Sequence, residues 1–411
     1  MPDLLARLSR SWERHRVASA PVTRRLYRCR CGRPLFFRNS RCLGCGAEVG
    51  YDPEQATLLA LPATQQTPYR ITAGRGPARV ERSYLRCANY TTPARCNWLV
   101  PVAKERARTA QILCRSCRLN RIVPDLDKSE HGIWWARIED AKRQVVSTLI
   151  TLGLPVRSRV SEDTAHGLAF ELLRSEPSGP RVVTGHANGI VTLDIEEADD
   201  ATREQRRAAM REPYRTLLGH LRHEIGHYYW YRLIENSPWH AAFREVFGDE
   251  RTDYAAALQR HYDTGPPADW TVAHVSAYAS AHPWEDWAET WAHYLHMIDA
   301  LDTAVSFGVS ARAIEATFDH FEADALAQTA PPNAADASAF LGFVNAWVEL
   351  ATVLNELSRS MGQPDFYPFV LSAAAVRKLH FVHRVVIDPR NRRETTRPSH
   401  MPGTLVADVA H

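Results

Sequence analysis

The chain has 411 residues, of which 45% are apolar and 24% are charged, a globular composition and a length that predicts two or three domains. It contains neither an apolar run close to the roughly eighteen residues of a membrane-spanning helix nor the apolar segment of a signal peptide, so we expect a cytoplasmic protein without membrane contact. The net charge of +3 conceals an asymmetry: residues 1–130 carry 22 Arg and 2 Lys against 10 acidic residues, which is +14 and leaves −11 for residues 131–411. The basic part predicts an acidic partner such as a nucleic acid, although a solvated arginine-rich surface would give the same charge.

Residues 1–24 are basic, and the apolar residues from Leu4 to Val17 recur at the spacing of a short amphipathic helix. All eight cysteines follow within residues 25–125, in two groups of four. The first group consists of Cys29, Cys31, Cys42 and Cys45, and the second of Cys87, Cys96, Cys114 and Cys117. Between the groups, residues 54–80 read as a polar connector that contains Gly and Pro.

Both groups have the residue types of a structural zinc site. Close cysteine pairs form turns whose backbone amides point at the sulfurs, and two such turns make a tetrahedral thiolate cage. A disulfide framework is the alternative, but no secretion signal precedes the cysteines, and redox chemistry lacks a thioredoxin-like context. The second group departs from the usual spacing, because eight residues separate Cys87 from Cys96. We expect up to two structural zinc ions, each folding a small module with little core of its own.

Residues 133–385 have the pattern of a second, mainly helical domain, after a boundary at residues 124–132 that contains turn and capping residues. Helical spacing marks residues 133–152, 203–236 and 345–362, and strands are expected at residues 169–175 and 181–199, with a hairpin at HANG. Residues 388–411 read as a disordered tail. The sequence therefore predicts an α+β protein in which small zinc-ribbon β modules precede a mainly helical domain with a short antiparallel sheet.

The stretch His223-Glu224-Ile225-Gly226-His227 matches the H-E-x-x-H template of zinc enzymes. On a helix, residues four apart lie on one face about 5–6 Å apart at Cβ, so both imidazoles could bind one ion. Glu224 would lie beside that ion as a base for a water molecule. Gly226 costs about 1 kcal/mol in a helix interior, which indicates that a strand or a ligand approaches there closely. The alternative is two unrelated histidines on a helix surface.

A catalytic zinc site needs a third protein ligand, and residues 275–296 are rich in candidates. Glu285 and Glu289 are four residues apart and share a helical face. One of them could bind zinc while the other accepts a hydrogen bond from a ligand imidazole and thereby orients it. His282 and His293 are further candidates in the same segment.

Two segments, HEIGHYYW and SAYASAHPWEDWAETWAHYLH, carry a resemblance to the gluzincin metallopeptidases. The layout is similar to lethal-factor-like enzymes, in which a Tyr lies seven residues before the ligand Glu, as Tyr278 does before Glu285. Over most of residues 25–300 the chain resembles more closely a bacterial group of zinc-binding metallopeptidases that have an N-terminal zinc ribbon of the CxCG and CxxCG kind.

This resemblance implies a zincin-like domain over residues 133–385 and a role for each matching residue. The zinc ligands would be His223, His227 and Glu285, the base Glu224, the carboxylate behind a ligand imidazole Glu289, and the donor to the tetrahedral oxyanion Tyr278. Read from the sequence alone, the hydroxyl of this Tyr is explained equally by a core position.

The long segment between His227 and Glu285 departs from the resemblance, and it could cover or narrow the cleft. It contains Asp249, Glu250 and Asp253. These three residues could form a second metal site, but a helix cap and surface charges explain them as well.

The sequence thus predicts zinc-dependent peptide-bond hydrolysis, with zinc ribbons that select the target. An extended peptide substrate would pair with the strand at residues 189–195 by edge addition. In the alternative, the basic ribbons bind a nucleic acid or a protein partner and the zincin-like domain is inert. Zinc is the one cofactor expected, because the chain has no P-loop and no dinucleotide-binding motif.

Overall fold

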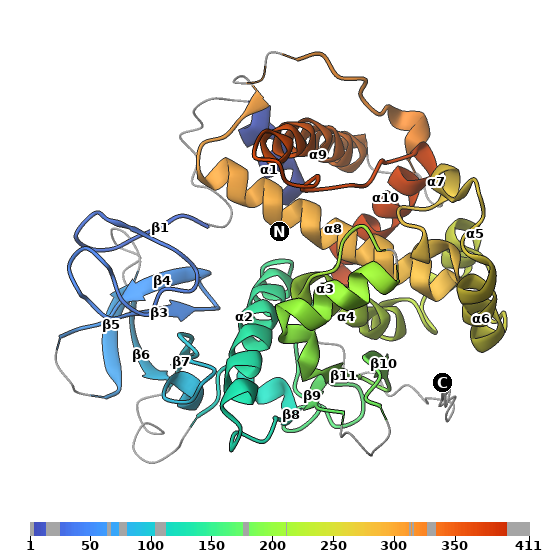
Figure 1. The fold of residues 1–411 in the computed structure, drawn as a ribbon. Helices are drawn as coiled ribbons and strands as arrows, with labels where there is room; N and C mark the ends of the chain where they lie inside the picture. Colours follow the sequence, from blue (N-terminus) through green and yellow to red (C-terminus); the bar gives the residue numbers. More distant parts are fainter. Residues whose placement is uncertain are drawn as a thin grey trace.

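The computed structural model describes residues 4–13, 25–63, 67–73, 80–102, 112–175, 181–210, 212–311, 314, 316–326 and 334–392 of the chain. The protein is of the α+β class, as the sequence predicted, with a strand-rich N-terminal region followed by a mainly helical region. In Figure 1 the N-terminal strands (blue) lie to one side of the helical part, and helix α2 (Ser129–Thr151) runs along the boundary between the two.

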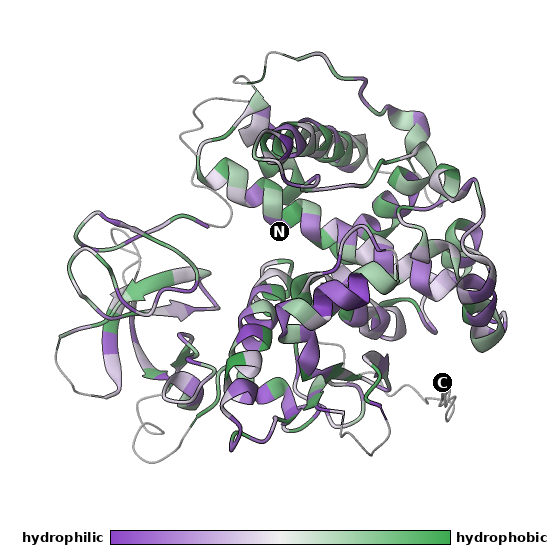
Figure 2. Cartoon of the chain, in the orientation of Figure 1, coloured by the Kyte–Doolittle hydropathy of each residue, from purple (hydrophilic) through white to green (hydrophobic). Residues whose placement is uncertain are grey.

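The N-terminal helix α1 (Leu4–Glu13) packs against the C-terminal helix α9 (Ala334–Ser360), as Figure 1 shows. It agrees with the first part of the helix predicted from Leu4 to Val17, and residues 14–17 lie outside the described ranges. The Trp12 indole donates a hydrogen bond of 2.7 Å to Glu349 of α9. Within the described residues, α9 alone is long and apolar enough to cross a membrane by length and composition. This helix was not identified as a candidate from the sequence, because only uninterrupted apolar runs were considered there. α1 covers part of its largely hydrophobic surface (Figure 2).

The cysteine-rich region is built from short antiparallel ladders. Its strands are β1 (Tyr27–Arg28), β2 (Pro34–Leu35), β3 (Val49–Asp52), β4 (Thr57–Ala60), β5 (Tyr69–Ala73), β6 (Val80–Arg86) and β7 (Leu99–Pro101). β1 pairs with β2, β3 with β4, and β6 lies between β5 and β7. The polar connector predicted at residues 54–80 is wrong in part, because β4 and β5 lie within it. Apolar residues such as Leu59 and Ile71 pack around the buried Tyr84 and Leu99 in a small core.

The helical part contains a four-stranded sheet in the order β10-β11-β9-β8. Its strands are β8 (Asn120–Ile122), β9 (Ala169–Leu173), β10 (Gly185–Ala187) and β11 (Ile190–Asp194). β10 and β11 form the predicted hairpin, whose turn residues Asn188 and Gly189 have φ of 52° and 80°, as a two-residue turn requires. The antiparallel sheet expected from the sequence is wrong beyond this hairpin, because β8 and β11 both pair with β9 in parallel. Helix α2 connects β8 to β9 and supplies the long crossover that parallel pairing needs.

The remaining helices surround this sheet and the site. They are α3 (Asp200–Ala209), α4 (Leu217–Leu233), α5 (His240–Phe247), α6 (Tyr254–Thr264), α7 (Trp270–Ala273), α8 (Pro283–Ser306), α10 (Ala373–Ile387) and α11 (Pro389–Arg392). The helix predicted at residues 203–236 is two helices, because Pro213 lies in the break and Thr216 caps α4 by accepting a 3.0 Å hydrogen bond from the Gly219 amide. The predicted disordered tail begins with α11, and its residues 393–411 lie outside the described ranges.

The second cysteine group leads directly into the helical part. Cys117 lies just before β8, which pairs with β9 of the central sheet. At the start of the cysteine-rich region, Arg25 forms ion pairs of 2.6 Å with Asp299 and 3.2 Å with Asp302, both on α8. Removing residues 1–130 would therefore remove a strand of the sheet and two largely buried ion pairs, so this region is not a detachable module.

Candidate metal centres

Among the described residues, three groups of side chains lie close enough together to bind metal ions. They are Cys29, Cys31, Cys42 and Cys45; Cys87, Cys96, Cys114 and Cys117; and His223, His227 and Glu285. Within each group the ligand atoms lie within 4.8 Å of one another. The tertiary structure thus brings together both predicted cysteine groups and the predicted set of two histidines and Glu285.

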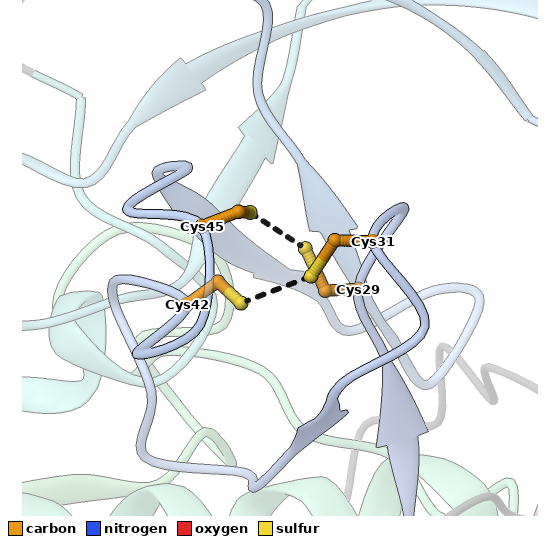
Figure 3. Close-up of side chains that lie close together, drawn as sticks. All are labelled: Cys29, Cys31, Cys42 and Cys45. Atoms are coloured by element: carbon orange, nitrogen blue, oxygen red, sulfur yellow. Dashed lines mark hydrogen bonds between the residues drawn. The ribbon is translucent and has the colours of Figure 1, made fainter.

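The first cysteine group lies where two tight turns face each other beside β1 and β2 (Figure 3). The sulfurs of Cys29 and Cys45 are 3.6 Å apart, and those of Cys31 and Cys42 are 3.7 Å apart. A tetrahedron with Zn–S bonds of about 2.3 Å places its sulfurs about 3.8 Å apart. Hydrogen bonds from the backbone amides of Cys45 and Gly44 lower the pKa of the Cys42 thiol to about 6, which favours the thiolate that zinc requires. Burial raises the pKa of the Cys29 thiol to about 12 in the same group, so the spacing of the sulfurs is the observation that fits zinc.

The second cysteine group is completely buried. The sulfurs of Cys96 and Cys114 are 3.6 Å apart. The Cys114 amide donates to the Cys87 sulfur at 3.3 Å, and the Cys117 amide donates to the Cys114 sulfur at 3.4 Å. From α2, the buried Arg143 is attracted electrostatically to Cys96 and Cys117. A zinc ion with four thiolates carries a net negative charge, so a helix of the second region helps to balance this buried site.

The third group joins two helices. His223 and His227 lie on α4, and Glu285 lies in the first turn of α8. The Nε2 atoms of the two histidines are 3.2 Å apart, and Glu285 Oε2 and Oε1 lie 3.0 Å and 3.5 Å from Nε2 of His223 and His227 respectively. A tetrahedron with zinc–ligand bonds of about 2.0 Å places its ligand atoms about 3.3 Å apart. Glu285 Oε2 is buried and has no hydrogen-bond partner among the described residues, as expected of an atom that binds a metal.

Gly226 explains how α8 comes close enough to α4 to deliver Glu285. A Cβ atom at Gly226 would lie 3.0 Å from the Cα of Ala288 and 3.2 Å from the Trp291 ring. The Trp287 indole donates a 2.9 Å hydrogen bond to the Gly226 carbonyl. The close neighbour of this glycine is therefore a helix, rather than the strand or ligand expected from the sequence.

Gly226→Ala is expected to destabilise the fold by about 1 kcal/mol, because overpacking that costs about 2 kcal/mol outweighs a gain in helix propensity of about 1 kcal/mol. Urea denaturation of the two proteins measures the difference. Gly185→Ala is the control, since a Cβ there would meet no heavy atom within 4 Å. Equal or greater stability of Gly226→Ala would show that the contact between α4 and α8 is looser than the structure indicates.

Glu289 occupies a different place from Glu285. Its Oε1 accepts a 2.7 Å hydrogen bond from Nδ1 of His223, and its Oε2 accepts one of 2.6 Å from the Ser276 hydroxyl. Burial opposes ionisation of Glu289, but the hydrogen bond and charge of His223 hold its pKa below the ordinary value. Glu289 thus orients the imidazole from behind, and leaves the Nε2 lone pair directed at the other ligand atoms.

Glu224 and Tyr278 lie next to the three ligand atoms but outside their group. Glu224 is 8% exposed, no described residue hydrogen-bonds to its carboxylate, and burial raises its pKa. The Tyr278 ring lies 5.9 Å from the His223 ring, measured between centroids, and burial raises the pKa of its hydroxyl, which therefore remains a proton donor. The Glu224 carboxylate thus adjoins the site, and the Tyr278 ring lies near it with its hydroxyl hydrogen-bonded to Tyr262.

Two residues of the site were missed by the sequence analysis. The Tyr254 hydroxyl donates a 2.7 Å hydrogen bond to Glu285 Oε1, and Ser276 supports Glu289 as described above. Tyr254 comes from the long insertion between His227 and Glu285. It is far from both residues along the chain, so no local spacing in the sequence indicated that it belongs to the site. Ser276 lies inside the segment 275–296 that the sequence analysis singled out. Its small hydroxyl, two residues before Tyr278, was the one feature of the sequence that could have indicated a role in the site.

The second metal site considered at Asp249, Glu250 and Asp253 is contradicted by the structure. The first two carboxylates pair with arginines, at 2.7 Å and 2.5 Å. Asp253 caps α6 by accepting a backbone hydrogen bond of 3.0 Å. Asp253 is therefore a helix cap and Asp249 a surface charge, whereas Glu250 is a buried carboxylate paired with Arg244.

His282 and His293 also have structural partners. His282 caps α8 by accepting a 3.1 Å hydrogen bond from the Trp284 amide. His293 is buried, and its Nδ1 lies 2.5 Å from the Tyr367 hydroxyl. Neither belongs to a metal-binding group among the described residues.

Comparison with known proteins agrees with this arrangement of sites. Residues 131–385 match the family described as "Putative zinc-binding metallo-peptidase", and residues 26–128 match a zinc-ribbon domain. The chain belongs to this metallopeptidase family. Its matched region contains the whole His223, His227 and Glu285 group, and the matched zinc-ribbon region contains all eight cysteines.

Relatives of the chain occur in mycobacteria. The uncharacterized proteins Mb2598c of Mycobacterium bovis and Rv2568c of Mycobacterium tuberculosis are each 43% identical to this chain over 372 residues. The matched residues cover 89% of this chain and 97% of each relative. No solved structure matches the chain. The family and the two cysteine groups together support zinc as the metal of this protein.

Proposed function

We propose that this protein hydrolyses peptide bonds at a zinc ion bound by His223, His227 and Glu285, the ligand set of the gluzincins. The observation that supports this most directly is the convergence of the three ligand atoms within 4.8 Å beside the buried Glu224. Two unrelated surface histidines would have no reason to face a buried carboxylate oxygen that lacks a hydrogen-bond partner among the described residues.

Zinc, when bound, would polarise the scissile carbonyl and make a water molecule acidic enough for a carboxylate base. The carboxylate of Glu224 would accept that proton and pass it on to the leaving amine. The hydroxyl of Tyr278 would donate a hydrogen bond to the oxyanion as negative charge develops on it. Glu289 would keep the proton of His223 on Nδ1, as its 2.7 Å contact already does.

A peptide substrate would add to the sheet at β10 (Gly185–Ala187). This strand ends the sheet on the side of α4, whereas the strand at residues 189–195 lies inside the sheet between β10 and β9. The predicted pairing with residues 189–195 is therefore wrong, because their backbone groups are already paired on both sides. The outer edge of β10 lies beside α4, the helix that carries His223 and His227. A peptide paired with this edge in an extended conformation would therefore run close to the metal.

Zinc content tests the proposed site. We expect three zinc ions per chain, one for each ligand group, and two in the variant His223→Ala/His227→Ala. Elemental analysis of protein purified without chelators gives the number, and cleavage of an unfolded protein substrate should disappear in the same variant. His220→Ala, on the same helix but outside the group, should keep three ions and the cleavage. Two zinc ions in both the unmodified protein and the double variant would remove the basis of the proposal.

A second candidate function is binding by the ribbons. Residues 25–47 contain no acidic residue, and the arginines just before and between the first four cysteines lie at the surface. They are Arg28, Arg30, Arg33, Arg38 and Arg41. Such a surface would attract a nucleic acid or an acidic protein, as a target-selecting element of the peptidase or as the main activity of a cytoplasmic binding protein.

Point substitutions distinguish the two functions better than truncation, which would remove β8. If the ribbons bind nucleic acid, Arg30→Ala/Arg41→Ala should weaken binding and reduce the slope of log affinity against log salt by about 1 for each lost phosphate contact. Fluorescence anisotropy with a labelled duplex and with a labelled single strand measures both quantities. No binding by the unmodified protein at low salt would exclude nucleic acid as the partner.

A further inference from the structure

We propose that Tyr254 is a positioning residue of the metal site, whose hydroxyl engages one oxygen of Glu285 so that the other oxygen alone is left for the metal. The inference rests on the proposed function only in that it takes Glu285 as a metal ligand. It assigns a role to the insertion between His227 and Glu285, because that insertion supplies Tyr254.

The two oxygens of Glu285 have different surroundings. Oε1 accepts a 2.7 Å hydrogen bond from the Tyr254 hydroxyl and lies 3.5 Å from His227 Nε2. Oε2 has no hydrogen-bond partner among the described residues and lies 3.0 Å from His223 Nε2. A carboxylate with one oxygen held by a neutral donor binds a metal preferentially through its other oxygen, and its orientation is then set before the metal arrives.

Tyr254 is itself held firmly. It is the first residue of α6, directly after Asp253, whose side chain caps that helix. Its ring packs edge-on against His282, with centroids 5.1 Å apart, and against Trp284 at 5.8 Å. His282 and Trp284 lie just before Glu285 in the chain. One short segment therefore carries both the carboxylate that accepts the hydrogen bond of Tyr254 and the rings against which Tyr254 packs.

Single-oxygen binding has a consequence for chemistry. Three protein ligands that each use one atom leave a fourth tetrahedral position for water or substrate, whereas a carboxylate that binds through both oxygens would occupy it. A neutral tyrosine at this place donates one hydrogen bond and adds no charge, so the negative charge of Glu285 stays available to the metal.

Zinc affinity tests the inference. Removal of the hydroxyl in Tyr254→Phe is expected to weaken zinc binding at the histidine site by about 10–100-fold, the usual effect of losing a partner of a metal ligand. Competition with a chromophoric chelator, using zinc alone, measures the affinity of the ion that is lost in His223→Ala/His227→Ala. Tyr294→Phe is the matched control, because it removes another buried hydroxyl, bonded at 2.9 Å to His383, from the helix that carries Glu285. Its zinc affinity should stay within about twofold of that of the unmodified protein.

A second variant keeps the test decisive if Tyr254→Phe does not fold, which loss of the cysteine-bound zinc ions would reveal. Asp253→Ala removes the cap of α6, worth about 1 kcal/mol, and should weaken zinc binding by about fivefold because it loosens the helix that begins with Tyr254. Zinc affinity unchanged in a folded Tyr254→Phe, or in Asp253→Ala where the first variant is unfolded, would overturn the inference. Zinc affinity that depends on Tyr254 without any peptide cleavage would overturn the proposed function alone.

Discussion

Glu224→Gln is expected to lower kcat for peptide hydrolysis by about 10²–10⁴-fold and to leave the zinc content unchanged. The amide occupies the same space but cannot accept the proton of the attacking water. The carboxylate receives no hydrogen bond from a described residue, so the substitution breaks no contact that holds the fold. Initial rates on an unfolded protein substrate, beside elemental analysis of the same preparation, measure both quantities.

Glu245→Gln is the matched control for this change. Glu245 lies on the exposed side of α5, so the same loss of one negative charge should leave the rate within about twofold of that of the unmodified protein. Undiminished cleavage by Glu224→Gln would mean that the base is another group, and the assignment drawn from the H-E-x-x-H template would fail. If the variant lost zinc as well as activity, the loss of activity would be explained by damage to the metal site and not by loss of the base.

Cys114→Ser/Cys117→Ser is expected to unfold the helical part of the protein as well as the cysteine-rich region. A structural zinc ion contributes about 10–16 kcal/mol in small zinc-binding peptides, as much as the entire stability of a typical domain. The four cysteines of this group are buried, Arg143 of α2 faces them, and β8 of the central sheet follows Cys117. We expect loss of the cooperative thermal transition by circular dichroism and loss of zinc from the histidine site.

Cys31→Ser/Cys45→Ser makes the equivalent change in the first group and should have a smaller effect. These two cysteines are exposed, whereas all four cysteines of the second group are buried. The variant should lose one zinc ion, keep the other two, and keep peptide cleavage. If both double variants unfolded alike, or both left the histidine site intact, the structural distinction between the two cysteine groups would be wrong.

This contrast matters for the role of the ribbons. The second group is a structural part of the metallopeptidase. It leads directly into β8, and the negative charge of its thiolates is balanced by Arg143 of α2. The exposed arginines around the first group are the residues that the proposed partner would contact. A partner search should therefore use the whole chain with substitutions in residues 28–41 rather than a truncated protein.

Local spacing in the sequence determined the chemistry of this protein. Two histidines four residues apart lie on one helical face wherever that helix packs, and paired cysteines with neighbouring glycines form the same tight turns in any context. The two cysteine groups, the histidine pair, the α+β class and the hairpin at Asn188 and Gly189 therefore followed from short stretches of chain.

The tertiary structure decided everything that depends on contacts between distant segments. Glu285 and Glu289 are equivalent by helical spacing, and only the approach of α8 to α4 at Gly226 turns one towards the histidine Nε2 atoms and the other towards Nδ1. The same holds for Tyr254, which the insertion carries to Glu285, and for the parallel pairing that leaves β10 at the edge of the sheet. Close packing selects one arrangement from many that share the same local pattern, and it depends on the shapes of all the surfaces that meet.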